Sequence, residues 1–179
     1  MTVLTLDNAL FDGLSGRARG SYRLRQHSNL HQSYDEPCQR LLNALEPGTY
    51  IPPHRHSLDP KQETLIALRG EMALMLFGDS GKVTDVIRFG AGDACACRGV
   101  DLPPGAWHTV LALSAGSILF EVKAGPFNPA QAKELAPWAP AEDSPQVPGY
   151  LACLQAQVAG ASCAAPGEMR TSAGAIKVS

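Results

Sequence analysis

Three of the five histidines in this chain fall into two separate clusters that one metal ion could join. His54 and His56 are two residues apart, and His108 follows much later, directly after a Pro-Pro-Gly-Ala-Trp segment. Because side chains i and i+2 of a strand point to the same face, the first two imidazoles would converge on one point. Imidazole nitrogens with one carboxylate suit a divalent ion such as zinc, iron, manganese or nickel. The sequence therefore predicts a metal site, for which Glu63 is the candidate carboxylate.

The order and spacing of these residues resemble the two motifs of the cupin superfamily. The first motif has the form G-x5-H-x-H-x(3,4)-E-x6-G, and it matches Gly48, His54, His56, Glu63 and Gly70. In this chain six residues, instead of three or four, separate His56 from Glu63. Asp59 stands closer to the usual spacing, so we keep it as the alternative carboxylate.

The second motif, G-x5-P-x-G-x2-H-x3-N, matches at Pro103, Gly105 and His108. Cys97 and Ala112 stand where this motif has its first glycine and its asparagine. The resemblance implies that three histidines and one glutamate hold one divalent metal ion. We therefore expect the metal ligands to be His54, His56, Glu63 and His108.

A narrower resemblance, to the WbuC-type cupin-fold metalloproteins, extends over roughly residues 5–155. It rests on Arg23-Leu-Arg25, Asn29-Leu-His31, Gln39-Arg40, the segment 47–56, Trp107-His108-Thr109 and the segment 120–127. It implies an all-β, single-domain cupin fold, a double-stranded β-helix or jelly-roll barrel, with short terminal helices. That family is named for a gene of bacterial O-antigen clusters, so the resemblance also implies a loose link to surface polysaccharide biosynthesis, without a defined reaction.

The elements that must position these residues are mostly short strands. Strand patterns begin near Ser21, and further strands are expected at 39–45, 50–54, 64–69, 72–77, 83–89, 107–113 and 118–123. Their spacing is typical of a β-barrel or sandwich. Helices are expected only at the ends, from Asp7 to about Leu14 and at 150–158. We expect a helical segment at 1–20, the barrel at 21–125, a proline-rich arm and short helix packed on the barrel at 126–158, and a disordered tail at 159–179.

Two arginines suggest the kind of ligand that binds beside the metal. Arg23 and Arg25 would share one face of a strand, and a guanidinium fork matches carboxylate or phosphate oxygens. Asn29 and His31 are expected at the same mouth of the barrel. Two aromatic residues, Tyr50 and Trp107, are candidate apolar walls, although core packing explains them equally well. The sequence thus predicts a small-molecule ligand that is anionic or derived from a sugar.

The overall composition limits the partners and the compartment. A net charge of −2 and a pI near 6.2 argue against nucleic-acid binding, which usually needs a basic excess. The first residues lack a signal-peptide pattern, and no run approaches the ~18 apolar residues of a membrane helix. We therefore expect a cytoplasmic protein without a membrane partner, with its five cysteines reduced. Cys95 and Cys97 share a strand face and could bind a soft metal, but we interpret them as buried small apolar residues and leave them out of the site.

Three classes of function fit this metal site. In the first, the metal acts as a Lewis acid in an isomerase or epimerase of carbohydrate-related molecules. In the second, ferrous iron makes the protein a dioxygenase. In the third, the barrel binds a sugar or another small ligand without turnover. The sequence assigns no catalytic residue, and the resemblance implies a homodimer formed through the N-terminal segment or the proline-rich arm.

Overall fold

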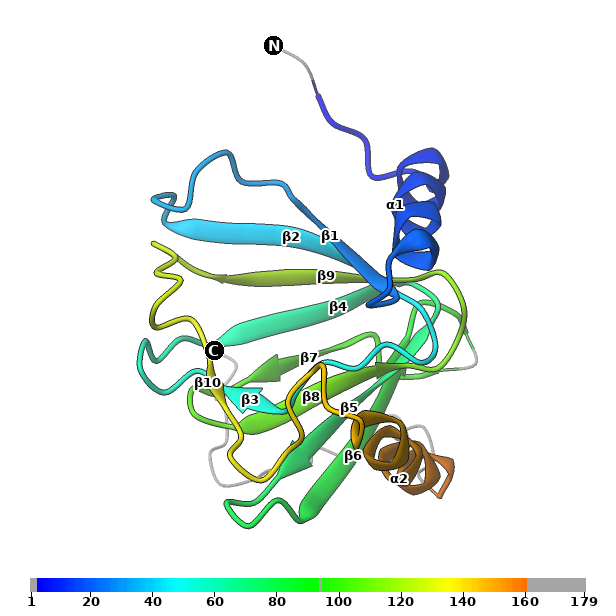
Figure 1. Cartoon of the computed structure of the whole chain (residues 1–179). Coiled ribbons are helices and arrows are strands. Elements are labelled where there is room, and N and C mark those ends of the chain that lie inside the picture. Colours follow the sequence, from blue (N-terminus) through cyan, green and yellow to red (C-terminus); the bar gives the residue numbers. More distant parts are fainter. Residues whose placement is uncertain (1–2, 94, 161–179) are drawn as a thin grey trace.

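Two antiparallel sheets of five strands lie face to face in the computed structural model, which describes residues 3–93 and 95–160 (Figure 1). The first sheet contains, in spatial order, β1 (Arg25–Asn29), β2 (Cys38–Leu45), β9 (Ser117–Ala124), β4 (Glu63–Arg69) and β7 (Gly99–Leu102). The second contains β10 (Glu134–Leu135), β3 (His54–Arg55), β8 (Trp107–Ala112), β5 (Glu71–Phe77) and β6 (Val83–Gly90). Strands distant in sequence are neighbours in both sheets, as in a jelly roll. The predicted all-β, single-domain fold is confirmed.

The main core lies between the two sheets. It is built from side chains that alternate along the strands, such as Leu65 and Ala67 of β4. Strand β8 is buried along its whole length, because its two faces pack against different layers. Val110 and Ala112 join the core between the sheets, whereas Trp107 belongs to a second cluster that includes the C-terminal helix. His108 is two and four residues before Val110 and Ala112 on the same strand, so its side chain points to the same, inner face.

Each sheet carries one helix, and both helices are visible at one side of Figure 1. Helix α1 (Asn8–Gly20) begins at Asp7, whose carboxylate accepts a hydrogen bond from Leu10 N at 3.0 Å. It runs past the expected end near Leu14, because Ala18 in its last turns is fully buried. Helix α2 (Val147–Ala159) packs on the second sheet through Leu151, Leu154 and Val158.

The predicted strands and the observed ones differ most around the prolines. Six strands, β2, β4, β5, β6, β8 and β9, match the expected ranges to within one residue at each end. The strand expected at 50–54 is instead an extended segment that leads into the two-residue β3, since Pro52 and Pro53 have no N–H for a ladder. Strand β1 starts at Arg25, because Leu24 has a φ of 54° and interrupts the extended chain before it.

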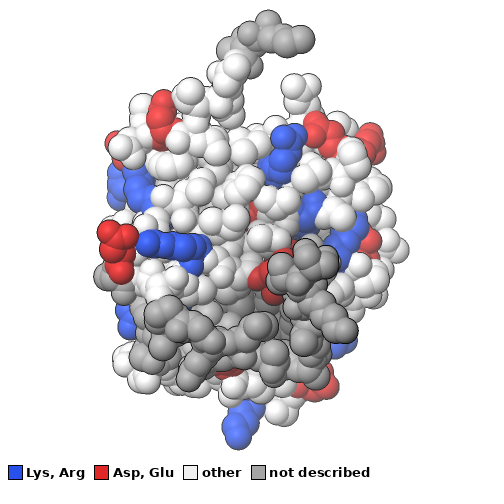
Figure 2. All heavy atoms as spheres, turned by 180° about the vertical axis from the view of Figure 1, so that it is seen from behind, with Lys and Arg blue, Asp and Glu red and all other residues white. Residues whose placement is uncertain are grey.

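Between β9 and α2 the proline-rich segment 125–146 crosses the open end of the barrel (Figure 1). Within it, β10 pairs with β3, so that Leu135 lies opposite His54 and Glu134 opposite Arg55. The expected tail falls mainly at 161–179, outside the described residues. Among the helices that are described, none has the length and apolar character needed to cross a bilayer. Figure 2 shows the opposite side of the molecule, where acidic and basic side chains are interspersed among uncharged ones.

Candidate metal centre

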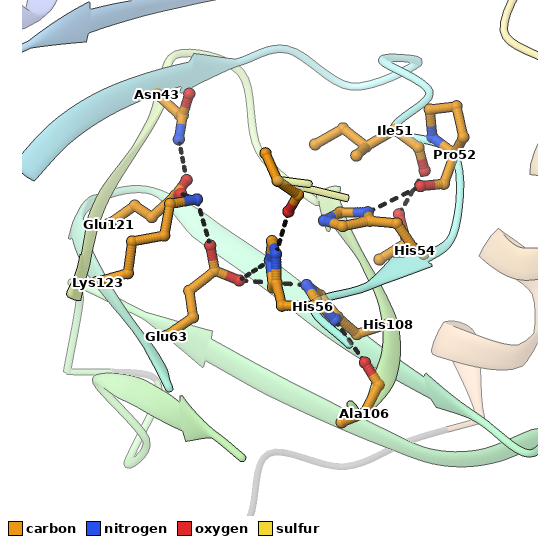
Figure 3. A network of polar contacts seen from close by, with 12 residues as sticks. Asn43, Ile51, Pro52, His54, His56, Glu63, Ala106, His108, Glu121 and Lys123 are labelled. Atoms are coloured by element: carbon orange, nitrogen blue, oxygen red, sulfur yellow. Dashed lines mark hydrogen bonds and ion pairs between the residues drawn. The ribbon is translucent and has the colours of Figure 1, made fainter. Parts of the chain in front are cut away.

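The three predicted histidines meet at the inner face of the second sheet (Figure 3). His54 lies on β3 directly opposite His108 of β8, and His56 follows one residue after β3. All three side chains are buried, and one potential ligand nitrogen from each lies within 4.8 Å of the others. In the described part of the chain, no other group of three or more histidine, cysteine or carboxylate ligands comes together in this way.

Backbone carbonyls orient all three imidazole rings. The Nδ1 atoms of His54, His56 and His108 lie 3.0, 2.5 and 2.9 Å from the carbonyl oxygens of Pro52, Ala132 and Ala106, respectively. A carbonyl oxygen only accepts, so we assign the proton to Nδ1 in each ring. Each Nε2 then presents its lone pair to the centre of the cluster. Metal-binding histidines commonly have this arrangement, because the second nitrogen fixes the ring and its tautomer.

Glu63, at the start of β4 on the opposite sheet, contacts two of the three imidazoles, but it is not part of the group whose ligand atoms all lie within 4.8 Å of one another. Its Oε2 atom lies 3.3 Å from Nε2 of His56 and 3.3 Å from Nε2 of His108. With Nδ1 protonated, these contacts bring a carboxylate oxygen against two lone pairs, and a positive charge must lie between them. Protonated imidazoles or a divalent metal ion can supply this charge. Nε2 of His56 is buried without a protein hydrogen bond, so the residues fit a metal ion.

The protonation states in the cluster also suit a metal. Burial lowers the pKa of His54 well below its usual value, and the positive charge of Lys133 acts in the same direction. Burial would raise the pKa of Glu63, but its contacts with His108 and His56 and the charge of Lys123 together hold it well below the ordinary value. A neutral imidazole and an ionised carboxylate are the forms that bind metal.

A network of charged and polar side chains contacts the other carboxylate oxygen of Glu63, Oε1 (Figure 3). Nζ of Lys123 lies 3.4 Å from Glu63 Oε1 and 2.7 Å from Glu121 Oε1, and Asn43 donates to Glu121 Oε2 at 2.9 Å. Burial and the nearby charge of Glu63 raise the pKa of Glu121. The sequence indicated only that Glu121 and Lys123 share a strand face. It did not predict that these two residues and Asn43 belong to the site.

Asp59, the alternative carboxylate, lies elsewhere. It forms an ion pair with Lys61 at 2.6 Å in the loop before β4, and Lys61 also donates to the carbonyl of Pro126. The extra residues between His56 and Glu63 therefore form a loop that ties the barrel to the arm. The structure brings Glu63 to the imidazoles, although its spacing departs from the motif.

A cavity of about 680 Å³ is lined by His54, His108 and Glu63, whereas His56 lies outside its lining. Four other predicted residues, Arg23, Arg25, Asn29 and His31, also line it. Its size is in the range of small-molecule sites. His31 is buried, and its Nδ1 accepts a hydrogen bond from Arg40 N at 3.1 Å, so it also fixes the loop between β1 and β2.

Two predicted wall residues do not line this cavity, and we leave them out of the ligand site. The hydroxyl of Tyr50 donates to the carbonyl of Pro140 at 2.8 Å, under the arm. The Trp107 ring packs against Arg55, whose guanidinium carbon lies 4.3 Å from the ring centroid. Trp107 precedes His108 on the same strand and therefore points to the opposite face. Both residues belong to the cluster that includes α2.

The two predicted arginines have a carboxylate partner within the chain. Glu142 of the arm accepts from Nε and Nη2 of Arg23, and it lies 2.5 Å from Nη2 of Arg25. Arg25 also donates to the carbonyl of Tyr50 at 2.8 Å. Their guanidinium groups thus fasten the arm at the mouth of the cavity. The sequence could not indicate this pairing, because the partners are distant along the chain.

Comparisons with known proteins identify the fold of this chain but show no activity for it. The model of a domain of unknown function, DUF6016, matches residues 6–89. No curated protein matches this chain. The solved structure of protein SO0799 from Shewanella oneidensis is 15% identical, with a TM-score of 0.50, and the match covers 72% of this chain and 83% of that one.

Two further solved structures show more distant likeness. KdgF from Halomonas sp. is 17% identical, with a TM-score of 0.44, and the match covers 58% of this chain and 82% of that chain. Oxalate decarboxylase from Bacillus subtilis, a protein with Mn(II) centres, is 17% identical, with a TM-score of 0.46, over 62% of this chain and 27% of that one. At this level of identity the likeness shows the fold alone, and the three-histidine cluster is the feature of this chain that fits a metal ion.

Proposed function

We propose that this chain binds one divalent metal ion through His54, His56, His108 and Glu63, and that a small molecule binds beside it in the cavity. The observation that carries the proposal is the common orientation of the three buried rings. Each is fixed through Nδ1, one ligand nitrogen of each lies within 4.8 Å of the others, and Nε2 of His56 and of His108 contacts Glu63. A bound divalent ion supplies Lewis acidity, which polarises a hydroxyl or carbonyl oxygen. Zinc, iron, manganese and nickel all accept this donor set.

Isomerase or epimerase chemistry on a carbohydrate-related molecule is our first choice of reaction. The cavity volume of about 680 Å³ accommodates a molecule of monosaccharide size. Its lining joins polar side chains such as Asn29 and Asn43 to apolar ones such as Leu65 and Val110, as expected for a polar ligand with a carbon skeleton. The role of the chain is to fix the metal ligands and orient the ligand, and Lys123 holds Glu63 in place for this purpose.

We also propose the narrower affiliation and setting that the motifs suggested. The chain would be a WbuC-type cupin, cytoplasmic and homodimeric, with a role connected to surface polysaccharide biosynthesis. Support comes from the residues that carry the resemblance, because Arg23, Arg25, Asn29, His31 and His108 all line one cavity. Sedimentation of the purified full chain tests the homodimer, and a monomer at micromolar concentration contradicts it.

Elemental mass spectrometry of untagged protein tests the metal site. We expect near-stoichiometric metal in the wild type and its loss in His54→Ala, His56→Ala and His108→Ala. His27→Ala is the matched control, because His27 lies on β1 outside the cluster, and it should retain the metal. Equal metal in all five proteins overturns the site.

The identity of the metal separates the three classes of function. Zinc, manganese or nickel directs the search to isomerisation of sugar metabolites. Iron, together with oxygen consumption in the presence of a substrate, favours the dioxygenase. Ligand binding without turnover of any bound molecule favours the non-catalytic module.

A further inference from the structure

The cationic side chains of the cavity differ in whether they have a carboxylate partner. Arg23 and Arg25 share Glu142, and Lys123 lies between Glu63 and Glu121. The fourth cation in the lining is Lys133, for which no carboxylate lies within 4.0 Å among the described residues. A cation without a counter-charge in such a cavity indicates a ligand that brings one.

The backbone on both sides of Lys133 is fixed to the metal-binding strand. The carbonyl of Ala132 lies 2.5 Å from Nδ1 of His56, which donates to it. On the other side, Glu134 pairs with Arg55 of β3 through two hydrogen bonds of 2.8 Å each. Lys133 is therefore held at the edge of the metal centre, and one of the two contacts that hold it, that of Ala132, also orients His56.

Lys133 is the excess cation among the charged side chains that line the cavity. The other three cations, Arg23, Arg25 and Lys123, are matched in number by the three carboxylates Glu63, Glu121 and Glu142, and a divalent metal ion would add further positive charge. Lys133 is an exposed residue that also lines the cavity, and nearby protein atoms desolvate its ammonium group and lower its pKa. The charges of Lys123 and Arg25 lower this pKa further, while Glu121 and Glu63 raise it. An anion beside Lys133 would relieve this excess.

We propose that Lys133 is the anion-binding residue of the cavity, and that the ligand is a small organic acid whose carboxylate or phosphate group pairs with Lys133 while an oxygen atom at its other end faces the metal ligands. This inference rests on the proposed function only for the contact between the ligand oxygen and the metal site. The pairing with Lys133 does not depend on the metal. It also revises the prediction that Arg23 and Arg25 bind the anion, because Glu142 already occupies both.

Calorimetric titration of metal-loaded protein tests the proposal with four probes. Gluconate and malate carry carboxylates, inorganic phosphate represents the phosphoryl group, and sorbitol is the neutral counterpart of gluconate. Losing a charge-assisted contact should weaken the binding of at least one anion in Lys133→Met by about tenfold or more. Lys133→Arg should recover part of this loss. The binding of sorbitol should be the same in all the proteins.

Lys82→Met is the matched control, because Lys82 is exposed in the turn between β5 and β6 and loses the same charge outside the cavity. Its affinity for each anion should equal that of the wild type. The proposal is overturned if no anion binds to the wild type, or if the wild type and Lys133→Met bind every anion equally. A preference for phosphate over both carboxylates identifies the anionic group as phosphoryl.

A parallel measurement separates this inference from the proposed function. The metal content of each sample is determined before titration, and the titrations are repeated on protein stripped with a chelator. Absence of metal in the wild type contradicts the proposed function, while the anion titrations still decide the role of Lys133. Thermal unfolding of Lys133→Met should match the wild type, since a purely structural lysine would instead change stability.

Discussion

His54 and His108 stand directly opposite each other on β3 and β8, with their ring centroids 4.4 Å apart. Strand β3 has only two residues, so a long ladder does not set the distance between these rings. Hydrogen bonds from the flanking segments set this distance instead. The buried Thr109 hydroxyl donates to the carbonyl of Ile51 at 2.6 Å, and Gly105 N donates to the carbonyl of His56 at 3.2 Å.

Thr109→Val should therefore weaken metal binding without removing a ligand. Valine keeps the shape of the side chain but leaves the carbonyl of Ile51 without its donor, so the segment that carries His54 loses an anchor. Outer contacts of this kind typically change metal affinity by about 10- to 100-fold. Competition with a fluorescent chelator measures the affinity. Thr64→Val is the control, because Thr64 bonds to Asp101 away from the cavity, and it should bind metal as the wild type does.

The choice between the two carboxylates gives a second prediction. Glu63→Gln should lower metal affinity more than Asp59→Asn, because Oε2 of Glu63 contacts two of the imidazoles and Asp59 pairs with Lys61. Metal competition assays on both variants decide the order. If Asp59→Asn has the larger effect, the loop before β4 must rearrange when metal binds, and the ligand set proposed here is wrong.

The trio of the buried Glu63 with the half-buried Lys123 and Glu121 predicts a non-additive effect on stability. Lys123→Met leaves two carboxylates buried without their shared cation, so it should lower the free energy of unfolding by roughly 3–5 kcal/mol. Adding Glu121→Gln removes one of those charges and should restore part of the loss. Urea unfolding of both single variants and the double variant, all without metal, gives the coupling free energy between Lys123 and Glu121. Simple additivity of the two changes contradicts the network.

The site histidines could be predicted because the information about them is local. The two-residue spacing of His54 and His56 fixes their common face, and the Pro-Pro-Gly turn marks the start of the strand that carries His108. Most strands were predicted for the same reason, since a period of two and nearby turn residues need no knowledge of distant contacts.

Long-range pairing explains what the sequence did not indicate. The role of Arg23 depends on Glu142, which reaches it only because the arm crosses the mouth of the barrel. Lys133 lies in a proline-rich stretch without periodicity, and only the pairing of β10 with β3 brings it to the cavity. The outward position of Trp107, by contrast, follows from the sequence alone, because the neighbour of a ligand histidine on a strand must point to the opposite face.

Glu142 makes the stability of the arm depend on pH. Partial burial would raise the pKa of its carboxyl, but hydrogen bonds and charges from Arg23 and Arg25 lower it below the ordinary value of 4.5. The unfolded chain therefore binds a proton at a higher pH than the folded chain does. The stabilisation is fully present above about pH 4.5 and is lost as the pH falls through the lowered pKa of the folded state.

Glu142→Gln should accordingly destabilise the protein by about 1 kcal/mol at pH 7, and by less at pH 3, where the wild-type carboxyl has begun to protonate. Urea unfolding at the two pH values measures both differences. Asp143→Asn changes the same charge at the adjacent exposed residue, and it should show little effect at either pH. An equal loss in Glu142→Gln at both pH values means that the ion pairs with the two arginines do not hold the arm, and that packing under Pro140 and Trp138 does so instead.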